Sequence, residues 1–152
     1  MKPYKLALIP ASIMAMTSFA FAADTVADDV VFADGAVAAS LTGAAGDAAA
    51  GRKVFANRKQ GNCLACHANA DMPEQSFHGE VGPALDGVAD RWEEAQIRGI
   101  LVNSKNTFED SIMPSFYRTE NGVRPLKKFD GKTILTAQQV EDVLAYLKTL
   151  KE

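Results

Sequence analysis

Both cysteines of this chain and one of its two histidines lie within five positions, in the stretch GNCLACHANA at residues 61–70. Cys63, Cys66 and His67 carry side chains that can form covalent bonds, bind metals or undergo redox reactions. The chain has 152 residues and uses these residue types nowhere else except at His78. This concentration predicts a single chemical centre at residues 63–67.

Four kinds of chemistry could use this cluster. A disulfide between Cys63 and Cys66 would close a very small loop and would stabilise the chain little. A thioredoxin-like redox pair needs a βαβ context, which the sequence does not show, and zinc needs four ligands where the cluster offers three. Covalent haem fits all three residues, because thiols at i and i+3 can each add to one haem vinyl group and His67 then follows as the proximal iron ligand. We therefore expect one covalent haem c.

A haem that only transfers electrons usually has a sixth ligand, and the sequence offers few candidates. Met113 lies in SIMPSFY at residues 111–117, where Pro114 favours an extended backbone at Met113 and keeps the segment out of a helix. Such a loop can present a thioether to the haem face opposite His67. A core methionine is the alternative interpretation of Met113. Met72 is expected to be a loop residue near the proximal side, and His78 is the rival ligand.

The first 22 residues have the pattern of a secretory signal peptide. Lys2 and Lys5 precede the uncharged run LALIPASIMAMTSFAFA, which ends in the cleavage pattern Ala-Phe-Ala at residues 20–22. A retained membrane anchor is the alternative, but the run is short and contains Pro10. No later segment is apolar enough to span a bilayer, so we expect an exported protein with no membrane span after cleavage.

The net charge of the chain after cleavage disfavours two classes of binding partner. Cleavage after residue 22 removes two of the 16 Lys and Arg residues and none of the 19 Asp and Glu residues, which leaves a formal charge of −5. A negative chain is a poor ligand for nucleic acid or for anionic membranes. We interpret the acidic residues between Asp24 and Asp34, and the lysines at 105, 127 and 128, as solvated side chains.

Three helices are predicted, which gives an all-α fold. The first runs from Asp47, a capping residue, to about Arg58. The second is expected from Asp90 to about Asn103, with a capping box over residues 90–93. The third begins after the capping box Thr136-Ala-Gln-Gln, and its apolar residues repeat at helical spacing as far as Leu150.

Specific contacts should join these helices around the haem. Gly51 would let the first helix approach the third closely, and Phe55 could pack against Tyr146. The Gly- and Pro-rich stretch VGPALDGVADR at residues 81–91 is typical of turns. A carbonyl near Pro83 could accept the second N–H of His67 and so orient the imidazole.

The order of these motifs resembles class I cytochrome c. CxxCH is followed by GPxLxG, then by a Met-Pro loop and an amphipathic last helix, over roughly residues 47–150. GRKVFANRKQGNCLACHA, FHGEVGPALDGVADRW, ILVNSKNTFEDSIMPSFY and KTILTAQQVEDVLAYLKTL further resemble the SoxX group, the monohaem subunits of bacterial SoxAX complexes. The N-terminal VVFADGAVAASLTGAAGD is also similar to SoxX, so the resemblance covers nearly all of residues 23–152.

The resemblance implies a small class I cytochrome c fold and a place in thiosulfate oxidation. Cys63 and Cys66 would bind the haem, with His67 as proximal ligand and Met113 as distal ligand. The protein would work in the periplasm as the electron-accepting subunit of a heteromeric L-cysteine S-thiosulfotransferase and would not be catalytic alone. A SoxA-like cytochrome would be its partner, thiosulfate would be coupled to a cysteine of a SoxY-type carrier, and a downstream cytochrome or other acceptor would take the electrons.

Two further classes of function stay open, namely a free class I cytochrome c that serves a respiratory chain, and a haem sensor or peroxidase whose distal ligand leaves.

The predicted organisation is a signal peptide at 1–22, an N-terminal arm at 23–46 and a cytochrome c domain at 47–152. A solvated arm has little use for Val31, Phe32 and Leu41, so we expect these residues to anchor a SoxA-like partner. Packing of the arm on its own domain is the alternative.

Overall fold

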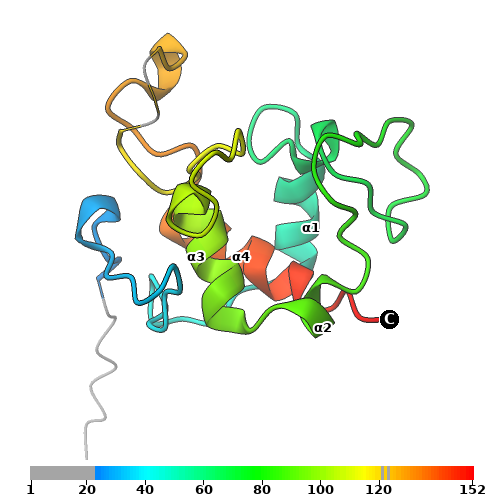
Figure 1. Ribbon diagram of the computed structural model, residues 1–152, viewed down its shortest axis with the longest axis horizontal. Coiled ribbons are helices and arrows are strands. Elements are labelled where there is room, and N and C mark those ends of the chain that lie inside the picture. The colour runs from blue at the N-terminus through cyan, green and yellow to red at the C-terminus, as the bar shows by residue number, and fades with distance from the viewer. Residues whose placement is uncertain (1–22, 121, 123) are drawn as a thin grey trace, which may run out of the picture.

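The fold of this protein, seen in a computed structural model, is described here for residues 23–120, 122 and 124–152, so the predicted signal peptide at 1–22 lies outside the described residues. Within them, the regular elements are helices, with one isolated β-bridge between Ala33 and Ala36. The α-helices are α1 (Ala48–Ala56), α2 (Val88–Arg91), α3 (Glu94–Asn103) and α4 (Ala137–Leu147) (Figure 1). Short 3-10 helices lie at Ala27–Asp29, Cys63–Ala65, Ser104–Asn106 and Lys127–Phe129. The prediction of an all-α fold is confirmed.

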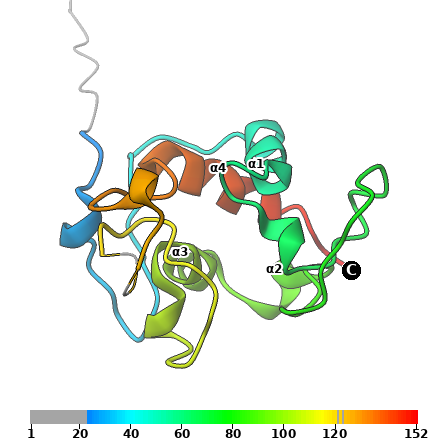
Figure 2. The same cartoon turned by 90° about the horizontal axis from the view of Figure 1, so that it is seen from above.

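Helices α1 and α4 pack closely and form the centre of the molecule (Figures 1 and 2). A Cβ atom on Gly51 would lie 1.9 Å from the carbonyl oxygen of Asp142, so only glycine permits this approach. One turn further along, the rings of Phe55 and Tyr146 meet edge to face, with centroids 5.5 Å apart. Both contacts predicted from the sequence are confirmed.

The predicted helix starts are correct at two of three places. The Asp47 side chain accepts hydrogen bonds from two backbone N–H groups of the first turn of α1. Thr136 and Gln139 form the expected capping box of α4. Helix α4 ends at Leu147, yet Leu150 beyond it is still buried. No helix in the described part of the chain is both long enough and apolar enough to cross a membrane.

The second predicted helix is wrong in its start and its continuity. It is divided into α2 and α3 at Trp92, whose backbone is extended (φ −136°, ψ 138°). The capping box that begins α3 is formed by Glu93 and Gln96, not by the predicted pair, and Asp90 instead accepts a hydrogen bond from the backbone of Glu152. The break turns the Trp92 ring edge to face against Phe108, with centroids 5.8 Å apart.

The N-terminal arm packs on its own domain. Figure 2 shows residues 23–46 running beside α3 and α4, at the end of the molecule opposite the loop over residues 66–86. Val37 and Leu41 keep only 2% and 1% of their surface exposed, and Phe32 packs against the same core. The expectation that Leu41 anchors a partner is therefore wrong, because its own domain already buries it; Val31, by contrast, is 81% exposed.

A buried ion pair holds the arm in place. Arg98 of α3 contacts Glu141 of α4 with an Nε–Oε1 distance of 2.9 Å, and each side chain is about 5% exposed or less. The backbone N–H of Leu41 donates to the same Glu141 oxygen at 2.8 Å, and the Arg98 guanidinium donates to the carbonyl of Val37 at 3.0 Å. The arm thus supplies backbone groups that satisfy two buried charges.

Replacement of Glu141 with glutamine is expected to lower the free energy of unfolding by about 3 kcal/mol, because it leaves the buried Arg98 charge without its main partner. Thermal or urea unfolding followed by circular dichroism measures this loss. Lys148→Ala is the control, because it removes an ion pair with Glu94 whose side chains are about half exposed, and it should cost less than about 1 kcal/mol. Equal losses in the two variants would contradict the prediction.

Candidate functional site

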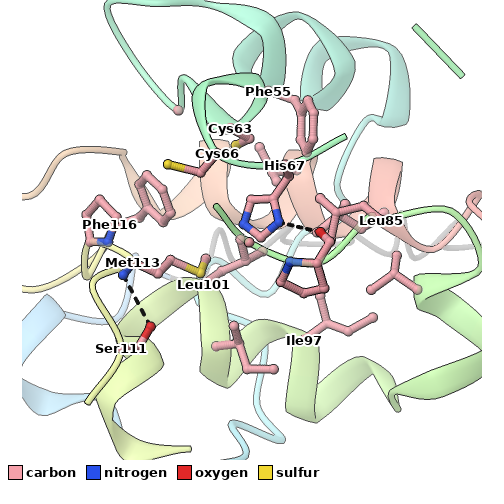
Figure 3. A pocket seen from close by; sticks show the side chains of 18 of the residues that line it. Phe55, Cys63, Cys66, His67, Leu85, Ile97, Leu101, Ser111, Met113 and Phe116 are labelled. Atoms are coloured by element: carbon pink, nitrogen blue, oxygen red, sulfur yellow. Dashed lines mark hydrogen bonds between the residues drawn. The ribbon is translucent and has the colours of Figure 1, made fainter. Parts of the chain in front are cut away.

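A cavity of about 500 Å³ lies between α3, the Cys63–Ala65 turn and the loops over residues 81–88 and 108–116. Its walls are mainly apolar and include Phe55, Leu85, Ile97, Leu101, Phe116 and Val143. Figure 3 shows Cys63, Cys66, His67 and Met113 pointing into the same space. The fold therefore brings all four predicted site residues to one cavity.

The two cysteines are positioned by a tight turn. Backbone N–H groups of Cys66 and His67 both donate to the carbonyl of Cys63, at 3.1 and 3.0 Å. This turn lets all three side chains line the cavity, and both thiols are free rather than joined in a disulfide. Burial raises the pKa of the Cys63 thiol to about 12. The thioredoxin-like alternative needs a βαβ context, and the described residues form no β-strand next to this turn.

The imidazole of His67 is held from two sides. Its Nδ1 lies 2.7 Å from the carbonyl oxygen of Pro83, the carbonyl region predicted from the sequence. A carbonyl can only accept, so Nδ1 carries the hydrogen and Nε2 keeps its lone pair for a metal. Gly82 packs against the ring, because a Cβ atom there would lie 2.4 Å from Cε1. The GPxLxG motif places Gly82 in a turn, and its contact with the imidazole is visible only in the structure.

Replacement of Gly82 with alanine is expected to displace the His67 ring, because the new methyl group would lie 2.4 to 3.0 Å from three ring atoms. We expect a lower yield of protein with bound haem and an altered Soret spectrum. Gly131→Ala is the control. Its positive φ of 63° should lower the free energy of unfolding by about 1 kcal/mol, but nothing lies within 4 Å of its Cβ position. An unchanged spectrum in the Gly82 variant would contradict the prediction.

Met113 lies in a segment without regular structure between α3 and α4, as predicted. Figure 3 shows its side chain extending into the cavity that also contains the His67 ring. The Met113 N–H donates to the hydroxyl of Ser111 at 3.2 Å, and its carbonyl accepts from the Ser104 hydroxyl at 2.9 Å. The Lys105 ammonium also contacts this carbonyl. These polar contacts were not predicted from the sequence.

The rival ligand His78 and the loop residue Met72 both lie outside the cavity wall. His78 does not line the cavity, and both its ring nitrogens make hydrogen bonds: Nδ1 accepts from the N–H of Asn69 at 3.2 Å and Nε2 donates to the carbonyl of Met72 at 3.1 Å. Met72 lies in a loop, as expected, but its side chain is fully buried in the core and is not part of the cavity wall. The His78 side chain thus stabilises the loop after the CxxCH motif through hydrogen bonds to its backbone.

A second network attaches that loop to the helices. The buried amide of Asn69 donates to the Tyr146 hydroxyl at 2.8 Å, which in turn donates to Asp71 at 2.8 Å. The Tyr146 hydrogen bond, and then Arg52, hold the pKa of Asp71 below its ordinary value. Because a carboxylate of lowered pKa stabilises the fold only while ionised, this contribution is lost as the pH falls through that lowered value.

The residues at this cavity fit a covalent haem. Two free thiols and an oriented imidazole stand at one wall, a thioether reaches in from another, and the lining between them is apolar. In the described residues, no group of three or more His, Cys, Asp or Glu side chains is arranged to hold a metal ion directly. This geometry does not favour the zinc alternative.

The comparisons with known proteins agree with this geometry. The sequence profile of cytochrome c matches residues 48–151. The chain belongs to the cytochrome c family. It is 33% identical to cytochrome c2 of Rhodospirillum rubrum over 135 residues, which cover 80% of this chain and 93% of that protein. A second cytochrome c2 sequence from Rhodospirillum rubrum is 32% identical over 120 residues, covering 70% of this chain and 99% of that protein.

A solved structure extends the likeness to the arm. The crystal structure of SoxXA from P. pantotrophus contains a chain that is 47% identical, covers 86% of this chain and 100% of that chain, and superposes with a TM-score of 0.80. The resemblance to SoxX noted in the motifs is thus confirmed. As a cytochrome c with a CxxCH motif, the protein carries one covalent haem c and is an electron carrier.

Proposed function

We propose that this cytochrome c is the monohaem electron-transfer subunit of a periplasmic complex like SoxXA, in which thiosulfate is oxidised. The supporting observation is the similarity to a SoxXA chain along that chain's whole length. The SoxXA chain is also more similar in sequence, at 47% identity against 33% for cytochrome c2. A signal peptide at residues 1–22 would deliver the chain to the periplasm.

In this proposal Cys63 and Cys66 form the two thioether bonds, His67 is the proximal ligand and Met113 the distal ligand. The bound haem would supply one-electron transfer. His67 is prepared for its role because Pro83 fixes its tautomer. Ligation by both residues would favour the reduced state, as an electron acceptor requires, and would leave no place at the iron for a substrate.

The chemistry served by the complex would be the coupling of thiosulfate to a cysteine thiol of a SoxY-type carrier. One sulfur–sulfur bond forms, one S–H bond breaks, and one proton and two electrons are released. This chain has no cysteine left for that reaction once Cys63 and Cys66 are alkylated. It would therefore receive the electrons one at a time through a SoxA-like subunit and pass them to a downstream cytochrome or other acceptor.

Purification from the native host grown on thiosulfate tests this function. The chain should elute from a sizing column together with a second haem protein, identified by mass spectrometry. Its haem should become reduced when thiosulfate, the partner and the carrier are all present, and should stay oxidised when the partner is omitted. Elution as a monomer in every fraction would overturn the proposal.

A free electron carrier is the second candidate, and the similarity to cytochrome c2 favours it. The same column separates the candidates, because a free carrier elutes alone and is reduced by respiratory donors without a thiosulfate-oxidising partner. A sensor or peroxidase would bind carbon monoxide readily, whereas a haem with both axial positions filled would not.

A further inference from the structure

We propose that Ser104 and Lys105, at the end of α3, position Met113 by holding its carbonyl oxygen. This inference rests on the proposed role of Met113 as distal ligand. It adds two positioning residues that do not line the cavity and to which the sequence motifs assign no role. Both act on the backbone of Met113, and through the backbone on the direction of its thioether.

Ser104 forms a buried hydrogen bond to the backbone of Met113. Its side chain is completely buried, and its hydroxyl donates to the Met113 carbonyl at 2.9 Å. A buried hydroxyl without a partner would be costly, so this hydrogen bond fixes the distance between the end of α3 and the loop. The Ser104 carbonyl in turn accepts from the N–H of Phe108 at 2.8 Å, which anchors Ser104 itself.

Lys105 adds a second donor to the same oxygen. A charged donor makes a stronger hydrogen bond than a neutral one. Lys105 is exposed to solvent, as interpreted from the sequence, and its ammonium in addition contacts the Met113 carbonyl.

The remaining bonds of the segment make the position of Met113 well defined. The Met113 N–H is bound by Ser111, so both backbone polar groups of the residue are satisfied by side chains. Pro114 follows at once and has no N–H to offer. Backbone hydrogen bonds hold the segment on either side, from Ser111 to Phe108 and from Phe116 to Leu101. At Met113 itself, the backbone groups are bound by side chains instead.

The experiment compares Ser104→Ala with Ser115→Ala in the haem-loaded protein. Ser115 is also nearly buried and its hydroxyl donates to Asn103 at 2.8 Å, so it joins the same two segments without touching the Met113 carbonyl. We measure imidazole binding to the ferric protein, the near-infrared band of methionine–iron ligation and the melting temperature. Loss of the Ser104 bond should raise imidazole affinity about tenfold, as expected for one hydrogen bond.

Ser115→Ala should leave imidazole affinity within about twofold of the unchanged protein, even if its melting temperature falls by a similar amount. Lys105→Met keeps the apolar stem and removes the ammonium, and it should also raise imidazole affinity. It provides the test if Ser104→Ala fails to fold. Equal effects of Ser104→Ala and Ser115→Ala would overturn the inference, because they would indicate general loosening.

Met113→Ala separates this inference from the ligand assignment. If that variant loses the near-infrared band while Ser104→Ala and Lys105→Met behave as the unchanged protein, the ligand is correct and the positioning role is wrong. If Met113→Ala keeps the band, the ligand assignment fails and the positioning role fails with it. In neither case does the result depend on thiosulfate turnover or on a partner.

Discussion

Replacement of Met113 with alanine is expected to abolish the weak near-infrared band of methionine–iron ligation and to lower the reduction potential by about 100 mV or more. The physical reason is that a thioether binds ferrous iron more tightly than ferric iron. A tenfold change in the ratio of these two affinities corresponds to about 59 mV for a one-electron couple. Met113 reaches into the cavity beside the His67 ring (Figure 3), so its loss leaves that wall without a ligand.

His78→Ala is the matched control for the Met113 variant. Both nitrogens of His78 are bound within the loop over residues 69–78, away from the cavity. This variant should keep the near-infrared band and the potential, while losing some thermal stability. The ligand assignment would be refuted if His78→Ala removed the band and Met113→Ala did not.

Deletion of residues 23–46 is expected to lower the melting temperature of the haem-loaded protein by about 15 °C or more. Full burial of a valine or leucine side chain contributes roughly 1.5–3 kcal/mol, and Val30, Val37 and Leu41 are all buried in the core. Their summed contribution is a large part of the 5–15 kcal/mol that is typical of a whole domain. The deletion also removes the backbone groups that bind Arg98 and Glu141.

Two point variants make the deletion interpretable. Leu41→Ala should cost about 2–5 kcal/mol, because it opens a cavity in the core. Val31→Ser should leave the melting temperature within about 2 °C, because the Val31 side chain is 81% exposed. An arm that served a partner alone would give the opposite pattern, with an unchanged melting temperature and weaker association.

The sequence was most informative where function depends on residues close together in the chain. The spacing of Cys63, Cys66 and His67 predicts haem attachment without knowledge of the fold, because the turn that presents them spans only five residues. The Thr136–Gln139 capping box similarly predicted the start of α4, since both partners lie in one turn. Local chemistry of this kind can be read from local sequence.

The break at Trp92 shows where local patterns fail. Residues 90–93 match a capping box as well as residues 93–96 do, and the choice is made by packing of the Trp92 ring on Phe108, sixteen residues away. The pattern of polar residues cannot contain that information. Tertiary contacts decided which of two equally good local signals ends one helix and begins the next.

The tertiary structure alone decided the role of the arm and of the residues around Met113. Composition suggests a solvated arm, but the buried Arg98–Glu141 pair needs backbone donors and acceptors, and the arm supplies them from about 60 and 100 positions away in the chain. Ser104 and Lys105 likewise gain their role only when the loop folds back on α3. Sequence by itself determined the chemistry of this protein, because covalent haem attachment needs only neighbouring residues; the geometry of the distal side needed the fold, because burial and long-range hydrogen bonds have no local signature.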